Sequence, residues 1–149
     1  MADPTVPWGI PLFDDNTPFA PIQAPFNSQS AALNDALNTI GADTGWVSVT
    51  LSSGIDKGNG LGVRRIGKTV YMRGAAIRSA GNYAASYTQA LVIPSGFRPP
   101  YFFRTWAGGY ASGAAGSLIA NFNSNGSVEI AAVGNSSDTA FLTLSYLID

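Results

Sequence analysis

The chain has 149 residues, enough for one compact domain with an appendage but short for two full domains. Charged residues make up 11% of it, less than half of the roughly 25% that is usual in globular domains. It contains no Cys and no His, which excludes disulfides, thiolate nucleophiles, Cys/His zinc sites and the usual general base near neutral pH.

The few charges are distributed unevenly. Residues 1–44 contain five acidic residues and no base, whereas residues 45–149 contain all eight bases and four acidic residues, a net of +4. With so few charges this asymmetry can arise by chance. It can also mean that an acidic segment binds a basic surface, either of a partner or of the chain's own C-terminal part.

Residues 1–26 are predicted to form an extended arm. They contain six of the nine prolines, a density that disfavours a regular helix and favours extended backbone. Large apolar residues lie among these prolines, and an extended segment cannot bury them by itself. We therefore expect the arm to anchor the chain on another protein, with Trp8, Phe13, Phe19 and Phe26 as the anchoring side chains.

Residues 27–40 are predicted to form the only helix, within a short oligomerising segment and linker over residues 27–44. Alanines favour this helix and Gly41 ends it. Leu33, Leu37 and Ile40 fall at heptad spacing and give a narrow apolar seam. The seam can pack on the chain's own C-terminal domain or on copies of itself. We prefer the second interpretation and predict a homotrimer.

From residue 45 onward the pattern changes to short strands with turns. The segments that favour strands are 46–51, 63–79, 88–93, 101–107, 117–122, 127–133 and 139–148, with a Gly-rich loop after the first. Gly67 with Lys68 suits a type II′ turn and Asn125 with Gly126 a type I′ turn. The predicted fold is all-β, an antiparallel β-sandwich or barrel head over residues 45–149.

This head offers little for catalysis. Its four carboxylates, Asp56, Glu129, Asp138 and Asp149, are spread over loops, a hairpin and the chain end, where turn capping and solvent exposure are their ordinary roles. A serine nucleophile would lack a histidine base, and no run resembles a calcium loop. We expect a non-enzymatic protein with no catalytic residues, no metal site and no cofactor.

Three aromatic residues and one arginine, all near small residues, are candidates for a glycan-binding surface. They are Arg104, Trp106 and Tyr110 in one segment and Tyr83 in another. Aromatic rings stack on sugar C–H surfaces, and Arg pairs with phosphate or carboxylate. The competing interpretation is a core or interface role, which is common for aromatics in strands. The bases are scattered along the predicted strands, which argues against nucleic acid. No apolar run is long enough to span a membrane, and the N-terminus lacks the basic start of a signal peptide.

Five segments in order carry a resemblance to a known family. They are W-V-S-V-T-L at 46–51, V-R-R-I-G-K-T-V-Y-M-R-G at 63–74, L-V-I-P-S-G-F-R-P-P at 91–100, S-N-G-S-V-E-I at 124–130 and L-T-L-S-Y-L at 142–147. This order resembles the head domain of phage receptor-binding and tail-fibre-type proteins from siphophages of Gram-positive hosts. The resemblance covers residues 46–147.

The resemblance implies a trimeric protein of the virion surface, assembled in the host cytoplasm, whose head commonly binds host cell-wall saccharides or phospho-polysaccharides. The chain departs from the family pattern because only the arm and one short helix precede the head, where a long shoulder and neck are usual. Two functions therefore remain open. One is a spike or fibre head that binds a host glycan, and the other is a capsid decoration or minor structural protein that clamps neighbouring virion subunits.

Overall fold

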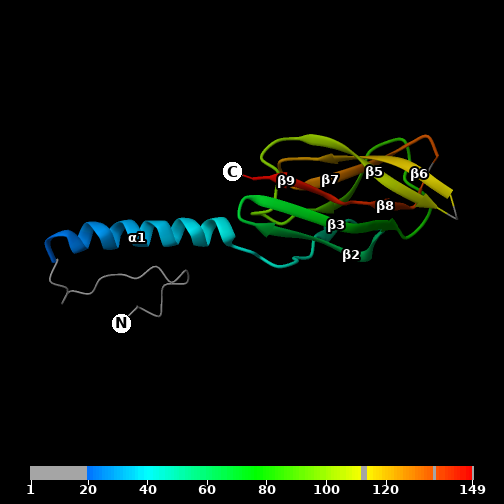
Figure 1. The fold of residues 1–149 in the computed structure, drawn as a ribbon. Helices are drawn as coiled ribbons and strands as arrows, with labels where there is room; N and C mark the ends of the chain where they lie inside the picture. Colours follow the sequence, from blue (N-terminus) through cyan, green and yellow to red (C-terminus); the bar gives the residue numbers. More distant parts are fainter. Residues whose placement is uncertain (1–19, 112–113, 136, 149) are drawn as a thin grey trace. The chain divides into compact units, whose positions relative to one another are not determined.

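The computed structural model describes residues 20–111, 114–135 and 137–148. The chain divides into two compact units, Met1–Ala42 and Asp43–Asp149. The described part of the first unit is helix α1 (Ala20–Gly41), and the second unit, hereafter the head, contains the strands (Figure 1). These are β1 (Thr50–Leu51), β2 (Ile55–Ile66), β3 (Thr69–Arg78), β4 (Thr88–Val92), β5 (Phe103–Ala111), β6 (Ala114–Phe122), β7 (Ser127–Val133), β8 (Thr139–Phe141) and β9 (Leu144–Leu147).

Helix α1 begins at Ala20, earlier than the predicted start at residue 27. The prediction that residues 20–26 are extended is therefore wrong. Proline is tolerated in the first turn of a helix, where backbone N–H groups have no intrahelical acceptor, and this accommodates Pro21. Pro25 removes one backbone hydrogen bond from the second turn without ending the helix. The rest of the predicted arm, residues 1–19, lies outside the described residues.

The head is an antiparallel sheet that curls until its hydrogen-bonded path closes. The strand order is β1-β4-β7-β6-β5-β8-β3-β2, and β9 also pairs with β3. Residues 43–47 close the path between β2 and β1, because Val47 and Val63 exchange backbone hydrogen bonds of 2.7 and 2.9 Å. The all-β antiparallel fold that the sequence predicted is confirmed, and the closed path gives it the form of a barrel.

The interior of the barrel follows from strand alternation. In β3, Val70 and Met72 are buried whereas Tyr71 and Arg73 face solvent, because successive side chains point to opposite faces of a strand. The largest fully buried side chains are Leu61, Val63, Val70, Met72, Tyr83, Leu91, Ile93, Leu118, Phe122, Val128, Ile130 and Leu142. Each such burial contributes about 1.5–3 kcal/mol, so the core can hold the outer surfaces of the strands in fixed positions.

Two glycines allow close approaches beneath the outer face of β2 and β3. Gly74 has a φ of +113°, and a Cβ placed on it would lie 2.3 Å from the Leu61 Cα. A Cβ on Gly62 would lie 2.8 Å from the Val47 carbonyl oxygen, so Gly62 lets residues 43–47 lie against β2. The glycine-rich stretch predicted as a loop is the first half of β2, which shifts register between Gly58 and Gly62 as a bulge.

The hairpin turns match the sequence prediction in place but not always in type. Gly67 and Lys68 form the two-residue turn between β2 and β3. The turn between β6 and β7 spans residues 123–126 and is closed by the Gly126 N–H, which donates to the Asn123 carbonyl at 2.8 Å. Asn125 is therefore at the third position of this turn and Gly126 at the fourth, one position away from the predicted type I′ arrangement.

Candidate functional site

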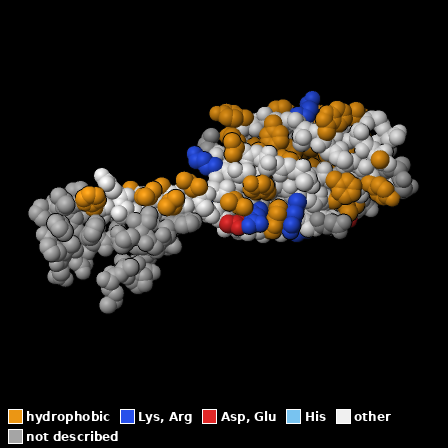
Figure 2. Space-filling model, in the orientation of Figure 1, with side chains coloured by type: hydrophobic (Ala, Val, Ile, Leu, Met, Phe, Trp, Pro, Cys, Tyr) orange, Lys and Arg blue, Asp and Glu red, His pale blue; other side chains and the backbone are white. Residues whose placement is uncertain are grey.

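The head exposes many large apolar side chains outside its core. Those in its described part are Trp46, Ile66, Tyr71, Tyr87, Tyr101, Phe102, Trp106, Tyr110, Val133, Phe141 and Leu147. Figure 2 shows that, on the face in view, hydrophobic side chains gather in patches and charged side chains are few. Contiguous exposed apolar surface of this kind marks interaction sites. Two exposed apolar patches of the head also contain arginines. The first patch lies along β5, and the second lies over β2, β3 and β9.

Strand β5 carries three of the four predicted glycan-binding residues on one side. Arg104, Trp106 and Tyr110 occupy positions of the same parity and are exposed, while Ala107 between them is buried. Trp106 is more open than Tyr110, with 68% of its surface exposed against 49%. An indole that faces solvent on a rigid strand presents a flat apolar surface to a ligand.

Arg104 is oriented by two neighbours. Its Nε donates to the Asn121 Oδ1 at 2.8 Å, from the position directly opposite on β6. Its guanidinium carbon lies 5.4 Å from the centre of the Tyr87 ring. The remaining guanidinium N–H groups form no ion pair among the described residues, so they can donate to a ligand. We call Tyr87, Arg104, Trp106, Tyr110 and Asn121 together the β5 face.

Tyr83 does not belong to this surface, and its prediction as a glycan-binding residue is wrong. It is fully buried in the core, and its hydroxyl donates to the Ala76 carbonyl at 3.2 Å. Burial raises the pKa of the Tyr83 hydroxyl to about 12. The sequence could not separate Tyr83 from Tyr87, because the segment between Gly81 and Thr88 has no strand alternation to indicate which aromatic points inward.

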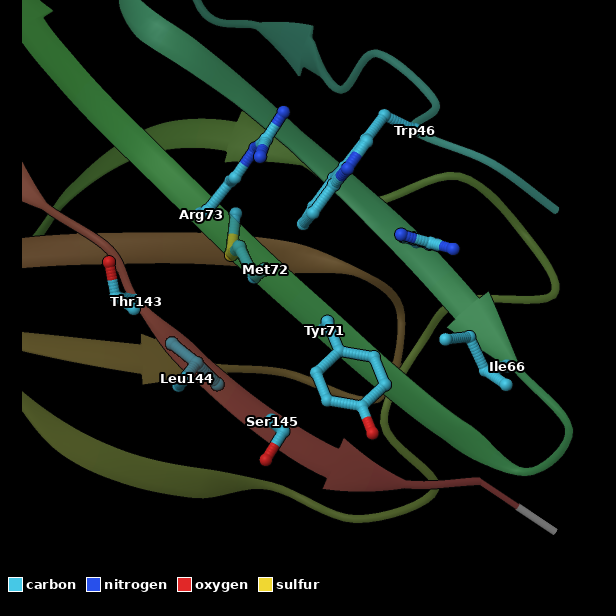
Figure 3. A pocket seen from close by; sticks show the side chains of 9 residues that line it. Trp46, Ile66, Tyr71, Met72, Arg73, Thr143, Leu144 and Ser145 are labelled. Atoms are coloured by element: carbon cyan, nitrogen blue, oxygen red, sulfur yellow. The ribbon is translucent and has the colours of Figure 1, made fainter. Parts of the chain in front are cut away.

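A second surface, the Trp46 groove, is an open hollow of about 480 Å³ on the outer side of β2, β3 and β9. It is lined by Trp46, Arg64, Ile66, Tyr71, Met72, Arg73, Thr143, Leu144 and Ser145. Figure 3 shows Tyr71 and Arg73 on β3, Ile66 at the end of β2, and Leu144 and Ser145 on β9, with Trp46 above β2. Sequence analysis missed this groove because its residues come from three distant segments of the chain.

Trp46 is held in place by the residues around it. Thr44 N–H donates to the Arg65 carbonyl at 3.0 Å, and Val47 N–H donates to the Val63 carbonyl at 2.7 Å, so β2 binds the backbone on both sides of Trp46. The Arg73 guanidinium carbon lies 4.0 Å from the centre of the Trp46 ring, within the range of a cation–π contact. The groove therefore combines a fixed aromatic surface with a fixed cation.

The second arginine of the groove is already paired. Arg64 donates from Nε to the Asp43 Oδ1 at 2.8 Å and forms an ion pair with the same carboxylate through its Nη2. The hydrogen bond from Arg64, with a further one from the Gly45 backbone N–H, lowers the pKa of Asp43 to about 2. Asp43 thus neutralises the charge of Arg64, while no carboxylate pairs with Arg73 among the described residues.

The predicted anchoring and oligomerising residues lie in the first unit. Trp8, Phe13 and Phe19 are outside the described residues. Phe26 lies on α1 rather than on an extended arm, and its side chain is exposed. On the same helix Leu33 and Ile40 are exposed, at 51% and 69%, and Leu37 is half-buried. The apolar seam of the helix is therefore largely open to solvent in the single chain.

Within residues 20–111, 114–135 and 137–148, no helix has the length and apolar character needed to cross a membrane. The same residues contain no group of three or more His, Cys, Asp or Glu side chains placed to hold a metal ion.

Among the solved structures that resemble the chain are two from phages. The head domain from lactococcal phage bIL170, one of the receptor-binding domains of lactococcal phages, aligns with a TM-score of 0.57 and 19% identity, over 69% of this chain and 96% of that one. The receptor-binding protein gp15 of Listeria phage PSA aligns with a TM-score of 0.62 and 16% identity, over 90% of this chain and 82% of that one. No protein-family model and no curated protein sequence matches. The chain therefore has the fold of phage receptor-binding proteins, as its sequence segments predicted.

Proposed function

We propose that this chain is a non-enzymatic host-attachment protein of a phage virion, and that its β5 face binds a saccharide of the host surface. The observation that carries this proposal is the solvent-facing Trp106 beside an oriented Arg104, on a head with the fold of phage receptor-binding proteins. Because fold alone does not define function, the β5 face supplies the chemical argument.

The β5 face suits a saccharide for two reasons. The indole of Trp106 and the phenol ring of Tyr110 offer apolar surface to the C–H side of a sugar ring, at small entropic cost because both have few rotatable bonds. Arg104 is held by Asn121 and Tyr87, so its free N–H groups can bind a hydroxyl, phosphate or carboxylate without first being ordered.

We also propose a homotrimer in which Leu33, Leu37 and Ile40 of α1 face one another. The exposed seam supports this, since a helix with apolar side chains open to water gains stability from a partner. Oligomerisation would repeat the β5 face on each copy and raise the affinity for a polymer through avidity. Attachment to other virion proteins would then fall to residues 1–26, through Trp8, Phe13, Phe19 and Phe26.

Adsorption of the phage to its host tests the proposal. The purified full chain, added in excess, should occupy the host saccharide and slow adsorption of intact phage. Adsorption that stays unchanged at saturating chain would overturn host attachment. In that case, counting copies in the particle would decide for capsid decoration, with hundreds of copies on the shell in place of a few oligomers at the tail.

A further inference from the structure

We propose that the Trp46 groove is a second ligand site of the head, selective for a sugar or polyol that carries a carboxylate or phosphate. The proposal rests on the proposed function only in taking the natural ligand to be a host-surface polymer. The groove shares no residue with the β5 face, and β8 lies between β5 and β3 in the sheet.

The groove contains an unpaired cation, Arg73. Arg73 stacks on Trp46 at 4.0 Å and forms no ion pair with a carboxylate in the described part of the chain. A planar guanidinium binds carboxylate or phosphate through two parallel hydrogen bonds, which are stronger than hydrogen bonds between neutral groups. Because the stack on Trp46 already orders Arg73, less side-chain freedom is lost when an anion binds.

The two arginines of the groove differ in their pairing. Asp43 binds Arg64 and holds it in place, so Arg64 contributes apolar side-chain surface more than free charge. One paired and one unpaired cation leave a single net positive charge at the ring of Trp46. That arrangement matches a ligand with one anionic group beside a sugar ring.

The shape and polarity of the groove lining also suit a sugar. Trp46, Ile66, Tyr71 and Leu144 offer apolar surface, and Thr143 and Ser145 bring exposed hydroxyls from the segment that includes β9 (Figure 3). A volume of about 480 Å³ lies within the range of roughly 300–1,000 Å³ that is typical of small-molecule sites. Apolar walls with a few oriented polar groups suit a sugar, which has one apolar face and a rim of hydroxyls.

Trp46 itself can report binding. The chain has three tryptophans, so Trp8→Phe with Trp106→Phe leaves Trp46 as the only source of tryptophan fluorescence in the otherwise full chain. Three probes are titrated: methyl α-glucuronide, glucose 6-phosphate and the neutral methyl α-glucoside. We expect a saturable change of Trp46 fluorescence with at least one anionic probe and none with the glucoside at the same concentrations. The anion that binds more tightly identifies carboxylate or phosphate as the preferred group.

Two variants of this reporter chain complete the test. Arg73→Gln should weaken binding of the anionic probe about tenfold or more, because it removes the charge but keeps hydrogen-bonding capacity. Lys57→Gln removes a cation of β2 that does not line the groove, so it should leave the affinity unchanged. Equal binding of the glucoside, equal affinity of the Arg73→Gln chain at an unchanged melting temperature, or no fluorescence response would overturn the proposal. These readings are independent of phage adsorption, so failure of the groove and failure of host attachment are distinguishable.

Discussion

The β5 face and the Trp46 groove are built in different ways on the same barrel. The β5 face comes largely from one strand, whose alternation alone places Arg104, Trp106 and Tyr110 side by side. The groove comes from three segments. It exists because residues 43–47 pack over Gly62 of the bulged strand β2. A flat, exposed indole suits one side of an extended polymer, whereas a hollow with one unpaired cation suits a single anionic group. Each surface can therefore be disabled separately, provided that the barrel remains intact.

The largest effect is expected from a substitution that destabilises the whole barrel and so disrupts the β5 face and the Trp46 groove together. Gly74→Ala would place a Cβ 2.3 Å from the Leu61 Cα, on a residue with a φ of +113°, so β2 and β3 would have to separate. We expect a loss of about 4 kcal/mol or more in the free energy of unfolding, measured by denaturant titration. Gly81→Ala is the matched control, because Gly81 also has positive φ but open space around it, and it should cost only about 1–2 kcal/mol. Equal losses for the two variants would contradict the close approach.

The next largest effect is expected from a change of oligomeric state, which sets how many copies of each binding surface one particle of the protein carries. Leu37→Asp places a charge in the proposed seam of α1 and should convert the oligomer to monomer, as measured by light scattering. Binding to whole host cells should then fall about 100-fold through loss of avidity, while the affinity of the groove for a small anionic probe stays unchanged. Ala31→Asp, on the exposed surface of the helix away from the seam, is the control. A wild-type chain that is already monomeric at micromolar concentration would contradict the seam.

Salt separates the two surfaces without any substitution. Binding of an anion at Arg73 depends on charge, so its affinity should fall several-fold as ionic strength rises from about 0.01 to 0.15 M and the Debye length shortens from roughly 30 to 8 Å. Stacking of a neutral sugar on Trp106 should change little. Isothermal titration at the two ionic strengths measures both. An anion affinity that does not respond to salt would argue against Arg73 as its binding group.

The smallest expected effect is a pH dependence of stability at the edge of the groove. The pKa of Asp43 is about 2 in the folded head, below its ordinary value of 3.8, so its pairing with Arg64 stabilises the fold above about pH 4 and is lost as pH falls toward 2. The melting temperature of wild type should therefore fall further between pH 4 and pH 2 than that of Asp43→Asn. Asp56→Asn removes an exposed carboxylate without removing an ion pair of the described residues, and should follow wild type. If the melting temperatures of all three chains fall equally between pH 4 and pH 2, the Asp43–Arg64 pair does not contribute to stability.

The sequence predicted those features that depend on local pattern. Strand patterns predicted the antiparallel head, because period two needs no knowledge of distant residues. Arg104, Trp106 and Tyr110 were grouped because they are close in the chain, but the predicted strand ended at residue 107, whereas β5 extends to Ala111 and places all three on one side. Where packing over a distance decides, prediction from sequence failed. The sequence predicts a loop at the glycine-rich start of β2, because the bulge between Gly58 and Gly62 forms only where this stretch pairs with the distant strand β3. Tyr83 was misplaced and the Trp46 groove was missed for the same reason, that long-range contacts have no local signal.

The prediction for the first unit failed in a different way. Proline density suggested an extended chain up to residue 26, but helix α1 starts at Ala20. Position within the helix matters more than the number of prolines, because the first turn needs no N–H donors. The helical state of residues 27–40 was predicted, and the exposure of Leu33 and Ile40, with Leu37 half-buried, leaves the proposed seam available to a partner.

The most direct test of the central claim compares two exposed aromatic residues in the adsorption assay. Trp106 lies on the β5 face, whereas Tyr101 is 75% exposed on the head but lies outside that face. We expect Trp106→Ala to raise the concentration of chain that halves phage adsorption by about tenfold, the equivalent of about 1.4 kcal/mol, and Tyr101→Ala to leave it unchanged. If the Trp106→Ala chain inhibits adsorption as well as wild type, or if both variants lose inhibition equally, the β5 face is not the surface that binds the host.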